Sequence, residues 1–235
     1  MANRIRVGLF GALVAGLAVT AAIQSAAAST VEQPRLPQRA ADAAGFIPPG
    51  WTLTGHQAAD LNGDGRSDLA LLIGRAGSAG EPASHMVFVA FAEPAVGYRL
   101  AARNHALFDN ARPESSGDVP PNADTIRIER GSLILSFEYL RGMATYRFRW
   151  DGGAMRLIGY DMSGVSGGCM TTTSINYLTG RARLTAGYID QDSDRTVSRR
   201  LARMARPTLD GIDPATFDPT EGMTGDPLWC DAESQ

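Results

Sequence analysis

The strongest constraint on the fold is a run of alternating apolar and polar residues between Thr125 and Tyr160. Its segments TIRIER, SLILSFEYL, MATYRFRW and AMRLIGYD are separated by glycine-containing turns. Alternation with a period of two places successive side chains on opposite faces of a β-strand, and pairs such as Asp-Gly are typical of hairpin turns. The pattern therefore predicts an antiparallel meander.

The segments on either side of this run also favour strands. DLALLI and HMVFVAFA, upstream, are continuous apolar runs typical of buried strands, and the β-branched stretch TTTSINYLTGRARLTAGY predicts further strands downstream. VSRRLARMA is compatible with a helix, because Val197, Leu201 and Met204 fit one helical stripe. We therefore expect an all-β fold, mainly an antiparallel meander or a sandwich-like domain, with at most one short helix.

The beginning of the chain has the features of an export signal. Arg4 and Arg6 precede an apolar run that ends in small residues. We expect a signal peptide over residues 1–28, a Pro- and Ala-rich linker over 29–50, and a single β-rich domain with an irregular C-terminal tail over 51–235. No later stretch is long and apolar enough to span a membrane. The sequence therefore predicts a periplasmic or secreted protein.

Cys169 and Cys230 are the only cysteines in the sequence, and two cysteines in an exported chain are expected to form a disulfide. The bridge would attach the irregular C-terminal segment to the body of the domain. In the chain-entropy model, such a bridge contributes about 4 kcal/mol to the free energy of unfolding. The formal net charge of −3 argues against a nucleic-acid partner.

The segment DLNGDGRSD, residues 60–68, places acidic side chains, an Asn and two glycines directly before an apolar strand. Calcium takes six to eight oxygen ligands, and alternate positions of a tightly turning backbone supply them. An EF-hand would require a Glu where Leu71 stands in an apolar run, so that motif is excluded. The expected calcium ligands are Asp60, Asn62, Asp64, the backbone carbonyl of Arg66, and Asp68.

This segment resembles the calcium loop of FG-GAP/VCBS-type repeats, in which D-x-N-G-D-G-x-x-D links two strands of a small β-sheet. The resemblance covers Asp60 to Ile73 and implies Ca²⁺ as the bound ion. Such repeats usually occur in series that build propeller blades, whereas this sequence contains a single loop, so we do not expect a complete propeller. The layout of export signal, loop and meander also resembles small bacterial exported proteins that carry this repeat.

A second acidic stretch, DQDSDR, imitates the spacing with Asp190, Asp192 and Asp194. Arg195 stands where the loop needs a glycine, and Ser198 stands where it needs its final acid. The sequence therefore favours a solvated hairpin tip over a second ion site.

A secreted hydrolase is the alternative interpretation. GVSGG, with Ser166 at its centre, resembles the glycine-flanked nucleophile of serine hydrolases, and His56 and Asp68 precede it in the order found in chymotrypsin-like enzymes. His56 and Asp68 are, however, too close in sequence for that fold, so a Gly-Ser loop between strands is favoured. A carboxylate pair is the other catalytic possibility, but nothing in the sequence pairs two acids.

The meander also contains candidate binding surfaces. Tyr146, Phe148 and Trp150 form either a sugar-stacking platform or part of the core, and the core interpretation is favoured. The opposite strand face carries a possible anion-binding stripe, which consists of Arg127, Arg147, Arg149 and Arg156. Ion pairs of these arginines with Glu129 and Glu138 in solvent are the favoured interpretation. The main hypothesis is a calcium-stabilised exported domain that binds a protein or glycan partner or has a structural role.

Overall fold

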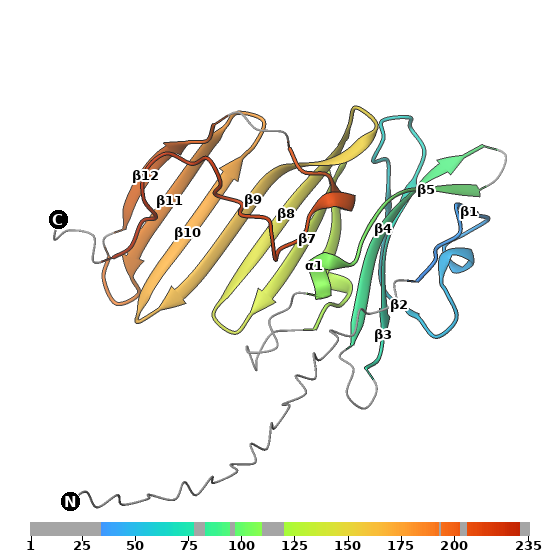
Figure 1. The fold of residues 1–235 in the computed structure, drawn as a ribbon, viewed down its shortest axis with the longest axis horizontal. Coiled ribbons are helices and arrows are strands. Elements are labelled where there is room, and N and C mark those ends of the chain that lie inside the picture. Colours follow the sequence, from blue (N-terminus) through green and yellow to red (C-terminus); the bar gives the residue numbers. More distant parts are fainter. Residues whose placement is uncertain are drawn as a thin grey trace, which may run out of the picture. The chain divides into compact units, whose positions relative to one another are not determined.

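The computed structural model describes residues 34–77, 83–94, 97–109, 120–192, 194–202 and 206–230. The predicted signal peptide lies outside these ranges. The described chain forms two antiparallel β-sheets, and its only α-helix is the short α1, Ala106–Asp109 (Figure 1). The all-β prediction is confirmed, and the described strands do not form the blades of a propeller. Within the described ranges, no helix is both long and apolar enough to cross a membrane.

The larger sheet is a continuous seven-stranded meander in which every strand pairs with its neighbours in the sequence. The predicted meander is therefore confirmed and continues into VSRRLARMA, which begins as a strand rather than a helix because Val197 pairs with Leu184 on the apolar face. The strand ends at Arg200, and Met204 of the predicted helical stripe lies outside the described residues. Its strands are β6 (Ile126–Glu129), β7 (Ser132–Tyr139), β8 (Gly142–Asp151), β9 (Ala154–Ser166), β10 (Cys169–Asn176), β11 (Arg181–Tyr188) and β12 (Arg195–Arg200).

The smaller sheet has the order β1-β5-β4-β3-β2. Its central strands β3 and β4 are the two continuous apolar runs, and both faces of these strands are buried. Leu71 lies in one core cluster, whereas Leu72 lies in the larger cluster shared with the seven-stranded sheet. A strand covered on both faces has no need for polar residues at alternate positions. Its strands are β1 (Arg39–Ala40), β2 (Thr52–Ala59), β3 (Asp68–Arg75), β4 (Ser84–Glu93) and β5 (Gly97–Asn104).

The segment predicted as a linker, 29–50, is part of the domain from residue 34 onward. Phe46, at the end of the 3-10 helix η1 (Ala44–Phe46), is 0% exposed and lies 5.7 Å from the ring of Phe88. Strand β1 pairs with β5, and Glu93 accepts hydrogen bonds from Arg39 and Arg99. The linker prediction is therefore wrong for this part. The segment is Pro- and Ala-rich like a linker, but its Phe46 packs onto an apolar face of β3 and β4.

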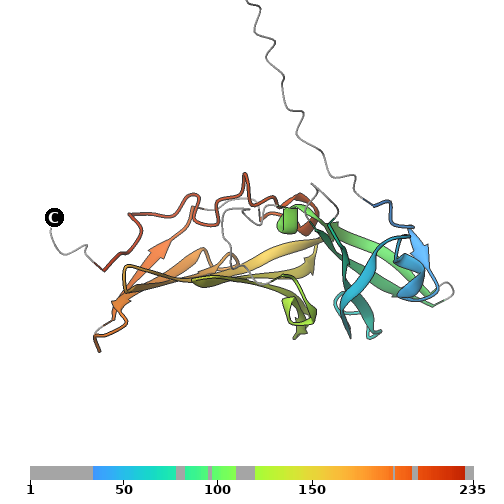
Figure 2. The same ribbon diagram turned by 90° about the horizontal axis from the view of Figure 1, so that it is seen from below.

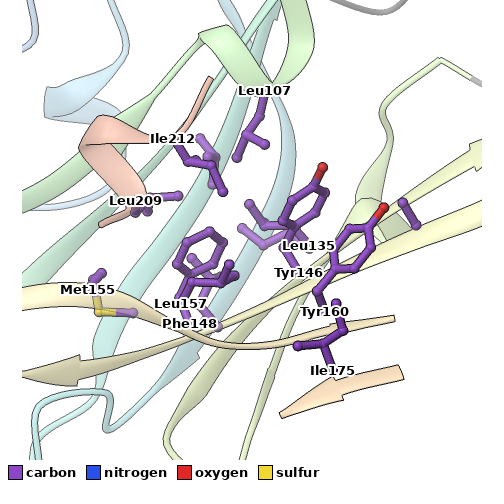
Figure 3. Close-up of a cluster of buried hydrophobic side chains, with 14 of the residues drawn as sticks. Leu107, Leu135, Tyr146, Phe148, Met155, Leu157, Tyr160, Ile175, Leu209 and Ile212 are labelled. Atoms are coloured by element: carbon purple, nitrogen blue, oxygen red, sulfur yellow. The ribbon is translucent and has the colours of Figure 1, made fainter. Parts of the chain in front are cut away.

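The C-terminal segment lies along one face of the seven-stranded sheet (Figures 1 and 2). Leu209 and Ile212, at the 3-10 helix η3 (Leu209–Gly211), are buried against Phe148 and Leu157 (Figure 3). Asn104 anchors this segment because its Nδ2 donates to the carbonyls of Leu209 and Ile212, at 2.6 and 2.7 Å. The segment is irregular, as predicted, but it completes the core.

The predicted disulfide is present. Cys169, at the start of β10, is bonded to Cys230, and their Cα atoms are 5.9 Å apart. The bridge joins two positions separated by 61 residues and holds the end of the C-terminal segment against the sheet.

Candidate metal-binding loop

The acidic segment is the connection of a β-hairpin. It leaves β2 after Ala59 and enters β3 at Asp68, and these two residues are paired partners across the hairpin. Gly63 and Gly65 have φ angles of 83° and 81°, a left-handed conformation that costs other residues free energy. Because no atom lies within 4 Å of a Cβ built at either position, backbone conformation rather than space requires glycine there.

Asp60 organises the first half of this loop. One of its carboxylate oxygens accepts the N–H of Gly63 at 2.7 Å, and the other accepts the N–H of Gly65 at 2.8 Å. These backbone hydrogen bonds, the Gly65 bond first, lower the pKa of Asp60 below its usual value. The carboxylate therefore stays ionised, and each oxygen keeps a lone pair that a cation can use.

Asn62 and Asp64 repeat this arrangement on the exposed side of the loop. Asn62 Oδ1 accepts the N–H of Asp64 at 2.9 Å, and Asp64 Oδ1 accepts the N–H of Arg66 at 2.8 Å. Asp64 Oδ2 accepts from the side-chain nitrogens of Asn62 and Arg66, at 3.3 and 3.2 Å. Alternate residues are thus fixed by their own backbone, which holds oxygen atoms at the loop surface.

Asp68, the last of the predicted ligands, also connects the loop to the sheet. Its side chain is 0% exposed, and its carboxylate accepts three backbone N–H groups, from Leu61 and Asn62 in the loop and from Ala92 in β4. Burial raises its pKa, while the three hydrogen bonds act in the opposite direction. In the structure Asp68 therefore clamps the loop to the sheet, and its role as a calcium ligand stays a prediction.

The remaining donor set matches a hard cation but is small. The loop presents the carboxylates of Asp60 and Asp64 with the amide oxygen of Asn62, and oxygen atoms of this kind are the ligands that calcium prefers. The backbone N–H and the guanidinium of Arg66 both bind Asp64, and the Arg66 carbonyl stays a predicted ligand. Within the described ranges, no three His, Cys, Asp or Glu side chains are grouped as metal ligands. Solvent would have to complete the coordination.

The other acidic stretch lies between β11 and β12, where Asp190, Asp192 and Asp194 are exposed. It therefore forms a solvated hairpin tip in the described residues on either side of position 193.

The residues of the hydrolase alternative lie in different parts of the fold. Ser166 ends β9 in the seven-stranded sheet, whereas His56 lies on β2 in the smaller sheet. Asp68 directs its carboxylate to backbone N–H groups. No hydrogen bond between any two of these three side chains is present in the described part of the chain.

The three aromatic residues named from β8 belong to the core. Tyr146 and Phe148 are buried beside Leu135 and Leu157, and burial raises the pKa of the Tyr146 phenol, which stays neutral (Figure 3). Trp150 packs edge-on against Phe91, with ring centroids 4.7 Å apart. The core interpretation of these aromatic residues is confirmed.

Two of the arginines named from the meander have acidic partners. Arg127 pairs with Glu129 at 3.2 Å, as predicted, and Arg147 pairs with Asp161 at 3.6 Å rather than with Glu138. A different group of arginines, on β11 and β12, lines a groove that the sequence reasoning missed. Its signal was present in RARL and SRRL, where arginines recur on two strands that turn out to be adjacent.

Comparison with known proteins adds no family to this description. No protein-family model, curated protein or solved structure matches the chain.

Proposed function

We propose that this protein is an exported, disulfide-closed β-domain whose loop at residues 60–68 binds Ca²⁺, and that it binds a partner or has a structural role outside the cytosol. The observation that carries the proposal is the loop geometry. Asp60, Asn62 and Asp64 are held by backbone hydrogen bonds in a hairpin connection with left-handed glycines, so their oxygens are arranged before any ion arrives.

A bound cation has an electrostatic reason to stay in this loop. Asp60 and Asp64 place two carboxylates in one short turn, and the Arg66 guanidinium offsets only part of that charge through Asp64. With two accessible carboxylates, we expect a dissociation constant on the order of 10⁻⁴ to 10⁻³ M, the range of extracellular calcium modules. The loop would bind calcium outside the cell and remain metal-free in the cytosol.

The disulfide supports an exported location. Bridges such as Cys169–Cys230 persist in oxidising compartments and are rare in the cytosol. The predicted signal at residues 1–28 points the same way.

A thermal melt in calcium tests the proposal. An ion that binds only the folded state at one hundred times its dissociation constant stabilises that state by about 2.7 kcal/mol. For a chain of this size, each kcal/mol raises the melting temperature by about 2–4 °C. We therefore expect saturating calcium to raise the midpoint by about 5–10 °C relative to chelator, and we expect Asp64→Ala to abolish the shift.

Asp192→Ala is the matched control, because Asp192 is an exposed acid in the other acidic hairpin turn. This variant should retain the full calcium shift. An equal shift in Asp64→Ala would place the ion elsewhere, and the absence of any shift in the wild-type protein would reduce the loop to an acidic turn.

A further inference from the structure

An open groove lies at the end of the seven-stranded sheet, over strands β10, β11 and β12. Its volume is about 930 Å³, and Thr224 and Gly225 of the C-terminal segment border it. Arg181 and Arg183 of β11 are exposed, whereas the intervening Ala182 is buried against the core, so these arginines point away from the apolar face. The polar lining also includes Ser174, Asn176, Thr179, Ser198 and Arg200.

The arginines of this groove are close to one another. Arg181 lies directly opposite Arg200 in the antiparallel pairing of β11 and β12, and Arg183 follows two residues later on the same side of β11. Directly opposite side chains have Cβ atoms about 5 Å apart, and like charges in that position destabilise a sheet. The three arginines therefore repel one another on one surface.

No described carboxylate offsets this repulsion by an ion pair with Arg181, Arg183 or Arg200. The nearest acid in the strand register is Asp161 on β9, opposite Ser174. Its oxygens accept from the Ser174 hydroxyl and pair with Arg147.

A fourth arginine adds positive charge at the rim. Arg199 packs against Gly225, where a Cβ atom would lie 3.0 Å from its Nε. That Nε atom is buried and has no hydrogen-bond partner among the described residues. Its charge strengthens the attraction of the groove for an anion.

We propose that this arginine groove binds an acidic oligosaccharide, a chain of sugars that carry carboxylates. A guanidinium forms two parallel hydrogen bonds to a carboxylate, and a row of such groups matches a ligand with repeated negative charges. Short hydroxyl and amide side chains stand between the arginines, and they match the hydroxyl groups of the sugar.

The same lining argues against other anions. None of the described lining residues is aromatic, so nucleic-acid bases have no stacking surface in the groove. Its only apolar side chain is the small Ala182, which offers nothing to insert between lipids. The proposal names a partner class for the exported domain and rests on the proposed function for the location outside the cell, but the groove does not involve the loop at residues 60–68.

Isothermal titration with two forms of one oligosaccharide tests the proposal. The probe is a hexamer of galacturonic acid, and the comparison ligand is the same hexamer with every carboxylate methyl-esterified. The protein is recovered after expression of the full chain, and chelator is present because uronate oxygens bind calcium themselves. We expect the charged hexamer to bind and the esterified hexamer to bind at least tenfold more weakly.

Single substitutions locate the site. Arg181→Gln and Arg200→Gln should each weaken binding by about tenfold or more, because each removes a charge-assisted hydrogen-bonding group. Arg147→Gln is the matched control, since Arg147 lies on β8 outside the groove and is paired with Asp161. It should change the affinity less than twofold, and circular dichroism should show all three variants folded.

Several results would overturn the proposal. They are equal affinity for the charged and esterified hexamers, unchanged affinity in both groove variants, or tighter binding of inorganic phosphate, phosphatidylglycerol vesicles or a single-stranded oligonucleotide. The failure of this proposal is distinguishable from the failure of the calcium proposal, because the calcium melt with Asp64→Ala tests the loop independently of the groove. If calcium has no effect on stability but the hexamer binds, the groove proposal stands alone, and the reverse result leaves only the calcium loop.

Discussion

At the scale of single residues, Asp64 and Asp68 show how one residue type serves two purposes within one loop. The Asp64 carboxylate is at the surface, where it accepts from Arg66 and keeps an accessible oxygen. The Asp68 carboxylate is buried and accepts three backbone N–H groups, two from the loop and one from β4. Each of the two residues follows another Asp at the same spacing in the sequence. Only their neighbours in the folded structure distinguish their roles.

Asp68→Asn tests the clamp. An amide group replaces one acceptor oxygen with a donor, so at least one backbone N–H would lose its partner in a buried position. Leaving one such group unsatisfied costs about 1–3 kcal/mol. We expect a melting temperature lower by about 2–12 °C in chelator, where calcium contributes nothing.

Asp64→Asn is the control for this substitution, because its side chain is exposed and the amide oxygen still accepts the Arg66 N–H. Its midpoint in chelator should remain within about 2 °C of wild type, as for other surface changes. Equal destabilisation by the two substitutions would contradict the clamp.

At the scale of elements, the N-terminal segment explains why β3 and β4 are apolar at every position. One face of these strands packs against the seven-stranded sheet and the C-terminal segment, and the other packs against Leu36 and Phe46. Without residues 34–50, that second face would be exposed to water. The segment is therefore a covering layer, although its composition is that of a linker.

Phe46→Ala measures the contribution of this covering layer. Truncating a fully buried Phe costs about 3–5 kcal/mol in lost transfer free energy and cavity formation. We expect urea unfolding to show a loss of this size. A loss below about 0.5 kcal/mol would mean that the segment does not pack as described. Leu178→Ala, at an exposed turn position, is the matched apolar truncation and should have little effect.

At the scale of the whole molecule, the C-terminal segment is held at several places, among them isolated β-bridges to β9 and to Leu201. Asn104 binds its 3-10 helix η3 through two carbonyls, and the Cys169–Cys230 bridge holds its end. Leu209, Ile212 and Leu228 of this segment are buried in the core shared by both sheets. Most backbone hydrogen bonds within the segment close local turns, so its position on the sheet depends on these attachments and on its backbone hydrogen bonds to Leu157, Arg200 and Ala202.

Removing the bridge should therefore reduce global stability. A loop of 61 residues corresponds to about 4 kcal/mol in the chain-entropy model, with measured values for native bridges of about 2–5 kcal/mol. We expect the free energy of unfolding of the Cys169→Ser/Cys230→Ser double variant to be lower by about this amount, so that the variant unfolds at a lower urea concentration. Reduction of the wild-type protein should reproduce the effect, whereas adding reductant to the double variant should change nothing. Equal stability with and without the bridge would show that the other attachments of the segment suffice to hold it.

Much of this architecture was readable in the sequence, because it rests on local physics. Period-two alternation with glycine turns determined the meander, since a strand places alternate side chains on opposite faces. Two cysteines in a chain with a predicted export signal indicated the bridge, and the alternation of Asp60, Asn62 and Asp64 with glycines indicated a tight loop with oxygen atoms at its surface.

The rest depended on contacts between residues far apart in the chain. Asp68 became a clamp because β4 brings the N–H of Ala92 to it, and Phe46 became core because β3 and β4 have an apolar outer face to cover. Arg181 and Arg200 became neighbours only through the register of β11 and β12. The sequence alone determined which residues alternate and turn, whereas the tertiary structure decided which of them meet, because burial and charge proximity are properties of the assembled sheets.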